Sequence, residues 1–202
     1  MSGPCWLTGD DPVMTAYHDQ EWGRPVTGER ELYERLCLEG FQSGLSWRTV
    51  LAKRPAFREV FAGFDPPQVA GFGPDDVDRL LQDARIIRHR RKIEATITNA
   101  RALLALHESG SGLRELFWGY APEPGNARRP AVLADLPATT PAAGELSKRL
   151  RKLGFAFVGP TTAYASMQAC GIVNDHLTDC PFREEVEQQR VEALTTFGSR
   201  KR

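Results

Sequence analysis

The feature that most constrains this chain is a cysteine and a histidine near each of its two ends. Cys5 and His18 lie near the N-terminus, and His176 and Cys180 lie near the C-terminus of the 202 residues. Two thiolates and two imidazoles can form a closed tetrahedral zinc site, which would fasten both ends onto one globule. Simple burial is the alternative, because cysteine often acts as a small apolar side chain and no local Cys-x-x-Cys pair is present.

Apolar residues recur at helical spacing in almost every patterned segment. Leu32, Leu36 and Cys37 follow the acidic residues Glu29 and Glu31; Val77, Leu80 and Leu81 follow Pro74; Ile93, Ile97, Ala100 and Leu104 continue over a long segment. Asp65-Pro66 and Thr140-Pro141 each place a capping side chain before a proline, which is a helix start signal. No segment alternates convincingly as a strand would, so the sequence predicts an all-α fold.

The length suits one domain, which we expect to span residues 1–183. Residues 121–140 are rich in proline, glycine and small side chains and are predicted to form a long surface connection. Residues 184–202 are mostly polar, with Val186 and Leu194 as sparse apolar anchors, and are predicted to form a tail that is either a marginal helix or disordered.

Composition and charge limit the classes of partner. No run of about 18 apolar residues occurs and the N-terminus lacks a signal-peptide pattern, so we expect a cytoplasmic protein without membrane contact. Thiols stay reduced there, which favours metal binding or burial over disulfides, and Cys37 and Cys170 are expected in the core. Lysine and arginine together number 26, as do aspartate and glutamate, so net charge gives no attraction for a polyanion. No heptad pattern occurs, and a monomer is predicted.

Basic residues nevertheless gather in two segments. The first holds Arg85, Arg88, His89, Arg90, Arg91 and Lys92, and the second holds Lys148, Arg149, Arg151 and Lys152. Such runs are usually solvated helix faces, and a phosphate-binding face is the alternative.

A hairpin bounded by Gly154 and Gly159 follows the second basic segment, and a new helix is predicted to start at Pro160. Both glycines permit positive φ and close backbone approach, and the N–H groups that open a helix can bind phosphate. We therefore predict a DNA-binding helix-hairpin-helix element at about 144–171, with Lys152 and the two glycines at the DNA, against an ordinary turn between packed helices.

Aromatic residues accompany one carboxylate near the start of the chain. They are Trp6, Tyr17, Trp22 and Trp47, and the carboxylate is Glu39. Stacking surfaces with an acid suit a pocket for a flipped, electron-poor base. The alternative is that the aromatics fill the core and Glu39 lies on the surface at a helix end.

Four longer motifs carry a family resemblance. They are Ala16-Tyr-His-Asp-Gln-Glu-Trp-Gly23, Cys37-Leu-Glu-Gly-Phe-Gln-Ser-Gly-Leu-Ser-Trp47, Asp83-Ala-Arg-Ile-Ile-Arg-His-Arg-Arg-Lys-Ile93, and Phe157-Val-Gly-Pro through Met167-Gln-Ala-Cys-Gly-Ile-Val-Asn-Asp-His176. Together they strongly resemble the 3-methyladenine DNA glycosylase I family, in unbroken order from Cys5 to Cys180.

The resemblance implies a helix-hairpin-helix glycosylase that acts on double-stranded DNA containing 3-methyladenine. It implies one structural zinc ion bound by Cys5, His18, His176 and Cys180. It also implies that Glu39, Tyr17 and Trp47 contact the excised base, with Trp6 and Trp22 lining the pocket. Two positions depart from the family pattern, because Cys5 is followed directly by Trp6 and Met14 stands where an aromatic residue is common.

The chemistry expected from the resemblance is mild. Many helix-hairpin-helix glycosylases carry a catalytic aspartate where this chain has Asn174, and an amide cannot stabilise a developing sugar cation as a carboxylate would. The substrate should therefore have a weak glycosidic bond, as cationic 3-methyladenine does. We expect no lyase activity, because the pocket motifs contain no lysine.

Leu45 is the predicted wedge for the space that the flipped base leaves, with packing against the next helix as the alternative. The rival functional class is a zinc-stabilised DNA-binding module without chemistry. A third possibility is excision of another alkylated base.

Overall fold

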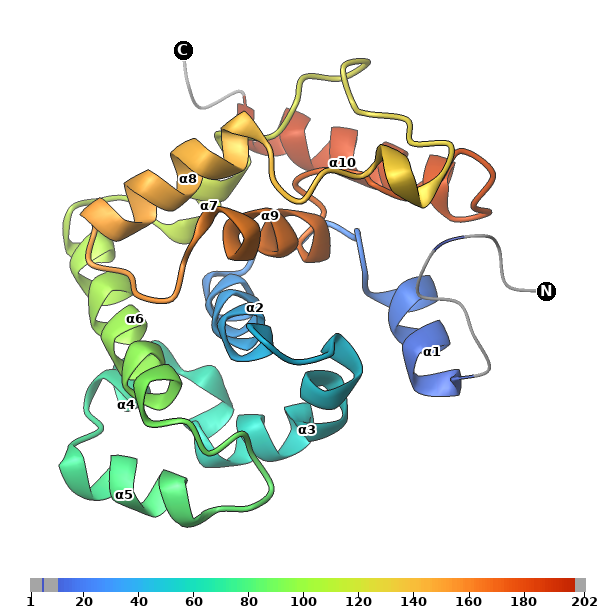
Figure 1. The fold of residues 1–202 in the computed structure, drawn as a ribbon. Helices are drawn as coiled ribbons and strands as arrows, with labels where there is room; N and C mark the ends of the chain where they lie inside the picture. Colours follow the sequence, from blue (N-terminus) through green and yellow to red (C-terminus); the bar gives the residue numbers. More distant parts are fainter. Residues whose placement is uncertain (1–4, 6–10, 199–202) are drawn as a thin grey trace.

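The computed structural model describes residue 5 and residues 11–198, and this part is built from helices without strands (Figure 1). The α-helices are α1 Pro12–Gln20, α2 Glu29–Gln42, α3 Trp47–Val60, α4 Pro66–Ala70, α5 Pro74–Gln82, α6 Arg90–Glu108, α7 Leu113–Trp118, α8 Pro141–Lys152, α9 Pro160–Ala169 and α10 Arg183–Gly198, with 3₁₀ turns η1 Ala62–Phe64 and η2 Leu133–Asp135. The all-α prediction is confirmed. None of the helices between residues 11 and 198 is long and apolar enough to cross a membrane.

Several helices begin where a capping side chain precedes a proline. Asp65 accepts a hydrogen bond from the Gln68 N–H at 3.4 Å, and Thr140 accepts one from the Ala143 N–H at 3.1 Å. Proline then occupies the first helical position, where its missing N–H costs nothing. Both predicted helix starts are therefore confirmed.

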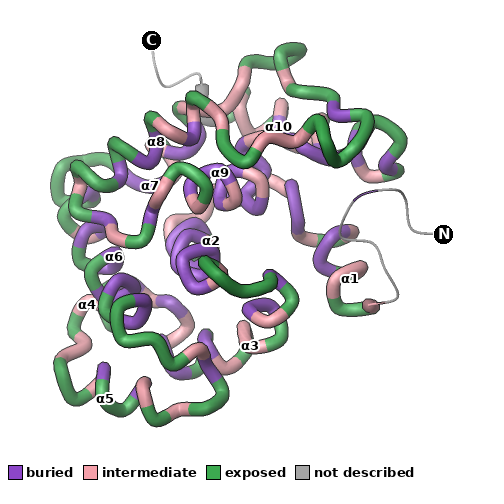
Figure 2. Tube along the Cα trace, in the orientation of Figure 1, coloured by how far each residue is buried: buried purple, intermediate pink, exposed green. Residues whose placement is uncertain are grey.

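Helix α2 forms the centre of the molecule, with α3, α6, α7 and α9 packed against it (Figure 1). Leu32, Tyr33 and Phe41 of α2 are fully buried, and Figure 2 shows the helix as mostly buried along its length. Its last carbonyl groups are capped from α6, because Lys92 Nζ donates to the Phe41 and Ser43 oxygens at 2.8 and 2.6 Å. This contact fixes the end of α2 that carries the site.

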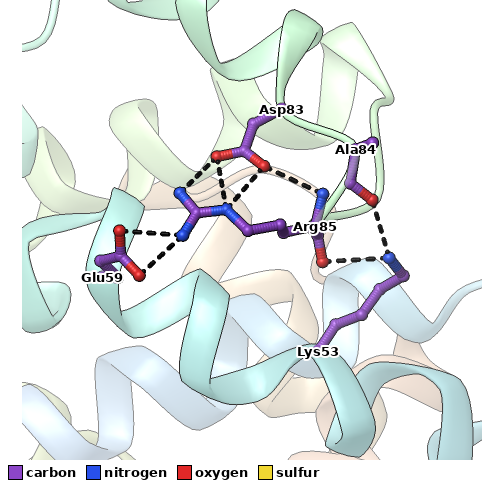
Figure 3. A network of polar contacts seen from close by, with 5 residues as sticks. All are labelled: Lys53, Glu59, Asp83, Ala84 and Arg85. Atoms are coloured by element: carbon purple, nitrogen blue, oxygen red, sulfur yellow. Dashed lines mark hydrogen bonds and ion pairs between the residues drawn. The ribbon is translucent and has the colours of Figure 1, made fainter.

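The first basic segment is largely used within the protein. Arg85 donates to Asp83 and to Glu59 of α3, while Lys53 Nζ donates to the backbone oxygens of Ala84 and Arg85 (Figure 3). These contacts tie α3 to the connection between α5 and α6. Arg90 pairs with Asp78, and Lys92 is buried, so three of the predicted cations have structural partners.

The described part of the C-terminal segment is packed onto the rest of the domain. Of the two states predicted for it, the described part is a helix, α10, which continues to Gly198 and packs onto the domain beside α7. Val186 is buried, and Arg183 and Arg190 are buried as well, because they donate to the backbone oxygens of Arg128 and Pro122 in the 121–140 connection. Polar side chains thus anchor this helix together with the apolar Val186.

Candidate active site and metal site

The four cysteine and histidine residues from the two ends meet in one buried cluster. Their ligand atoms all lie within 4.8 Å of one another. Cys180 Sγ lies 3.3 Å from His176 Nδ1 and 3.7 Å from His18 Nε2, and Cys5 Sγ lies 3.7 Å from His176 Nδ1. A tetrahedron with typical zinc–ligand distances has edges of about 3.5 Å. The donor set and its spacing therefore fit a metal ion.

Both histidines are held by their second ring nitrogen, as metal-binding histidines usually are. His18 Nδ1 contacts Asp19 Oδ1 at 2.7 Å, and His176 Nε2 lies 3.2 Å from the Trp22 backbone oxygen. Burial lowers the pKa of His176 to about 4, which keeps its imidazole neutral. Burial also raises the pKa of Cys5 to about 12, a direction that a bound cation would reverse. The cluster brings the two ends of the chain together and has the donors and geometry of a structural metal site.

A cavity of about 120 Å³ lies beside this cluster. Its lining comes from α1, the turn after α1, the central helix α2, the start of α3, and α9. The lining residues are Tyr17, Trp22, Glu39, Gln42, Trp47, Ala165 and Gln168. Three of the predicted aromatic residues and the predicted carboxylate are therefore brought together.

Glu39 is the unusual group in this cavity. Its side chain is 6% exposed, and no residue in the described part of the chain forms a hydrogen bond or ion pair with it. Burial raises the pKa of the Glu39 carboxyl to about 8, while the nearby positive charge of Arg35 opposes the shift. Arg35 itself donates to the Ala169 backbone oxygen at 2.7 Å. A buried carboxyl without a partner in a cavity is a strong indicator of a functional site.

The aromatic side chains form the walls around this carboxyl. The rings of Tyr17 and Trp47 are tilted at 44°, with their centroids 5.4 Å apart. The buried Trp47 Nε1 has no hydrogen-bond partner within the described residues, so the indole offers a free donor. Trp6 lies outside the described residues. Met14 is half-buried and packs against the core.

Trp22 links the pocket to the metal cluster. It lines the cavity, and its ring lies 4.7 Å from the His176 ring and 6.1 Å from the His18 ring, centroid to centroid. Tyr17 directly precedes His18 in α1. Because two pocket walls are attached to ligands of the cluster, a bound metal would also hold the pocket in shape.

The predicted DNA-facing residues lie on the outside of the molecule. Leu45 is 44% exposed in the turn between α2 and α3, so it does not pack into the core. Lys152 is exposed at the end of α8, and Gly154 has φ +92°. Gly159 does not use the positive φ that glycine permits, since it is extended with φ −63° as the cap of α9. Phe157 instead takes positive φ in this hairpin, at +56°, and is 38% exposed.

Asn174 occupies a structural position. Its Nδ2 donates to the Arg183 backbone oxygen at 3.0 Å and to Glu187 at 3.2 Å, and its Oδ1 accepts from the His176 N–H at 3.3 Å. The amide is buried and does not line the cavity. It therefore holds α10 and a metal-site residue in place.

Known proteins of one family are similar to this chain over most of its length. The methyladenine glycosylase family model matches residues 6–184. The chain belongs to the 3-methyladenine DNA glycosylase I family. DNA-3-methyladenine glycosylase 1 of Escherichia coli (strain K12) is 48% identical over 176 residues, covering 87% of this chain and 94% of the relative. The Haemophilus influenzae enzyme is 42% identical over 181 residues, covering 90% of this chain and 98% of the relative.

Solved structures of this family share the fold. A crystal structure of 3-methyladenine DNA glycosylase I aligns with a TM-score of 0.85 at 48% identity, covering 89% of this chain and 98% of that one. A variant of a 3-methyladenine DNA glycosylase I in complex with 3-methyladenine aligns with a TM-score of 0.82 at 34% identity, covering 87% and 94%. The predictions of family, fold and enzyme class, a DNA glycosylase of base excision repair, are confirmed.

Three pocket residues were missed by the sequence reasoning. Gln42, Ala165 and Gln168 line the cavity beside the predicted residues. Gln42 and Gln168 occur inside the motifs that carry the resemblance, but a glutamine in a helix has no spacing signal that marks it as functional. Their position depends on how α2 and α9 pack.

Proposed function

We propose that this protein binds alkylated duplex DNA, flips out 3-methyladenine and releases it by hydrolysis. The observation that carries the proposal is the buried Glu39 carboxyl, which has no partner within the described residues and lines an aromatic cavity. A cationic base supplies the positively charged partner that the Glu39 carboxylate lacks. The 3-methyladenine bound by a related glycosylase I supports the same ligand class.

The residues around the cavity make different contacts with the bound base. The Trp47 indole stacks on the flipped base, and Tyr17 and Glu39 hydrogen-bond to it, with Trp22 closing the wall next to the metal cluster. The Glu39 carboxylate stabilises the positive charge of the bound purine in a site of low dielectric constant. The already labile bond to deoxyribose then breaks, and water adds at C1′. The products are the free base and an abasic site.

We expect the enzyme neither to break stable glycosidic bonds nor to cleave the DNA strand. Asn174 is bound to α10 and supplies no carboxylate to the sugar, which limits the enzyme to bases that leave easily. No lysine is among the described residues that line the cavity, so we expect no Schiff base and no strand cleavage. The enzyme is therefore expected to be monofunctional.

Chromatography of the bases released from methylated duplex DNA tests the proposal. We expect 3-methyladenine in the soluble fraction, with the DNA strands intact until the abasic sites are cleaved by alkali. Binding of the DNA without release of any base would favour the DNA-binding module, and release of a different base would change the assigned substrate.

The rate should depend on the protonation of Glu39. The pKa of about 8 means that the carboxyl of the empty pocket is mostly neutral below pH 8 and ionised above it. Since the anion is the form that pairs with a cationic base, kcat/KM for 3-methyladenine release should rise between about pH 6.5 and 8 and level off above. A profile that is flat or falls over this range, measured on folded protein, would contradict the role of Glu39.

Leu45 is proposed as the wedge that fills the space left by the flipped base. Its exposure and its turn, anchored by Lys92 through the Ser43 oxygen, suit insertion into a duplex. Leu45→Ala should slow single-turnover release roughly tenfold, because unstacking is no longer offset by the inserted side chain. The exposed Val13, replaced by alanine, serves as a control of similar size. An unchanged rate for Leu45→Ala would remove the wedge.

We propose that the ion of the Cys5, His18, His176 and Cys180 cluster is zinc with a structural role. Four protein ligands leave no position for a reactive water. The exposed Lys152 and the hairpin of Gly154 and Gly159 are proposed to contact DNA phosphates, beside α9. The cytoplasmic location and the monomeric state stay predictions.

Removal of the metal should therefore weaken both stability and activity. Elemental analysis should find one zinc per chain, and chelation should lower the melting temperature and slow base release, since Tyr17 and Trp22 adjoin the cluster; added zinc should restore both. Cys180→Ser should lose the ion, whereas Cys37→Ala, a buried cysteine outside the cluster, should keep it. Full stability and activity in metal-free protein would contradict the assignment.

A further inference from the structure

Gln168 is a pocket residue whose amide is held in one orientation. It lies on α9, across the cavity from the start of α3, and shares the lining with Glu39, Tyr17 and Trp47. Its Nε2 donates to Asp175 Oδ2 at 2.9 Å. We infer that Gln168 is a specificity-determining residue, whose amide oxygen accepts a hydrogen bond from the exocyclic amino group of the flipped adenine. The inference rests on the proposed release of 3-methyladenine.

The orientation of the amide follows from its partner. Asp175 is 2% exposed, and its Oδ2 also accepts a hydrogen bond from the Tyr164 hydroxyl. An oxygen that accepts from two donors cannot face the amide oxygen of Gln168, so the amide nitrogen must point toward Asp175. The side-chain oxygen Oε1 of Gln168 is then the remaining polar atom of the amide, and no residue in the described part of the chain donates to it. Asp175 acts as the positioning residue.

A fixed hydrogen-bond acceptor at Gln168 distinguishes two bases of similar shape. 3-Methyladenine carries an amino group at C6, which can donate to the Gln168 oxygen. 3-Methylguanine carries a carbonyl oxygen at C6, so two acceptors would face each other without a proton between them. An unpaired polar group in a closed pocket disfavours the wrong ligand more strongly than a missing contact weakens the right one. Gln168 should therefore favour adenine through repulsion of guanine.

The ratio of the two bases released from one methylated DNA sample tests this assignment. Gln168→Ala removes the acceptor and should lower the preference for 3-methyladenine over 3-methylguanine by about tenfold, mostly through the KM of each base. Gln188→Ala, which alters an exposed glutamine of α10 outside the cavity lining, should leave the ratio within about twofold of the parent. An unchanged ratio for Gln168→Ala would overturn the inference.

A second variant tests the orientation itself. Asparagine at position 175 can donate to the Gln168 oxygen and turn its NH₂ toward the base, so Asp175→Asn should shift the ratio toward 3-methylguanine beyond the shift of Gln168→Ala. Tyr164→Phe keeps the carboxylate and should preserve the adenine preference. Because Asp175 precedes the metal-site residue His176, metal content and circular dichroism are measured on each variant. An Asp175→Asn protein that is folded, metal-loaded and unchanged in ratio would contradict the positioning role.

The outcomes separate this inference from the proposed function. If the parent protein releases neither base, the proposed function fails. If the parent releases 3-methyladenine and the ratio does not respond to Gln168, only the present inference fails.

Discussion

Replacement of Glu39 by glutamine is expected to slow the release of 3-methyladenine by about a hundredfold or more, the scale on which one preorganised electrostatic group acts in other enzymes. The substitution keeps the size of the side chain and removes its charge. No residue in the described part of the chain pairs with Glu39, so the loss falls on the bound base and spares the fold. Single-turnover kinetics on methylated duplex DNA measure the effect.

A matched control lies one and a half turns earlier on the same helix. Glu34 is 8% exposed like Glu39, but it pairs with Arg58 at 2.7 Å and does not line the cavity. Glu34→Gln should therefore keep near-parental base release. Equal losses in both variants would show that the effect comes from disturbance of α2, and would contradict a role for Glu39 at the base.

Stability gives an independent check on the same carboxyl. Its folded pKa, about 8, lies above the ordinary value of 4.5, so the unfolded chain gives up this proton first. The stability contribution is present below about pH 4.5 and is lost as the pH rises to about 8. The glutamine of Glu39→Gln cannot ionise, so the melting temperature of this variant should rise relative to that of the parent as the pH increases across this range. A melting-temperature difference that does not change with pH would mean that the pKa of Glu39 in the folded protein is near its ordinary value.

Gly171→Ala is expected to cost about 3 kcal/mol or more of unfolding free energy, because it combines left-handed backbone strain with a backbone clash. Gly171 has φ +69°, and a Cβ there would lie 2.5 Å from the Gly23 oxygen and 2.6 Å from the Arg24 carbonyl carbon. Neither atom belongs to a flexible side chain, so the segment after Trp22 must move. Equilibrium urea unfolding measures the change.

The control for this prediction is Gly110→Ala. Gly110 has a similar φ of +79°, but a Cβ there meets nothing within 4 Å. It should cost only the strain of about 1–2 kcal/mol. The additional loss of unfolding free energy in Gly171→Ala over Gly110→Ala measures the close approach of the end of α9 to the segment beside the metal cluster. Gly171→Ala should also weaken metal retention. Equal costs at the two glycines would contradict this account.

Features set by neighbours in sequence were predictable from the chain alone. Asp65-Pro66 and Thr140-Pro141 start helices as expected, because capping involves residues within one turn. The four metal-site residues came from a resemblance, since their spacing along the chain left burial as an alternative. The cluster in the structure resolves that choice.

Features that depend on distant backbone were not predictable. Lys92 appeared to belong to a surface basic segment, but the end of α2 supplies two carbonyl groups that make its burial favourable. The residues after Arg183 are mostly polar, which left a marginal helix or a disordered tail open, and the Arg183 and Arg190 side chains donate to carbonyl oxygens more than fifty positions earlier in the chain. Gln168 and the isolation of Glu39 likewise depend on how α2 and α9 pack.

The central claim is that the pocket recognises the charge of an already fragile nucleoside and leaves bond breakage largely to the damage. Single-turnover assays of metal-loaded protein on two duplexes test this most directly, one with 3-methyladenine and one with its uncharged, stable 3-deaza analogue. The account predicts rapid release of the charged base and none of the neutral one. Comparable release of both, or retention of 3-methyladenine on the DNA, would contradict it.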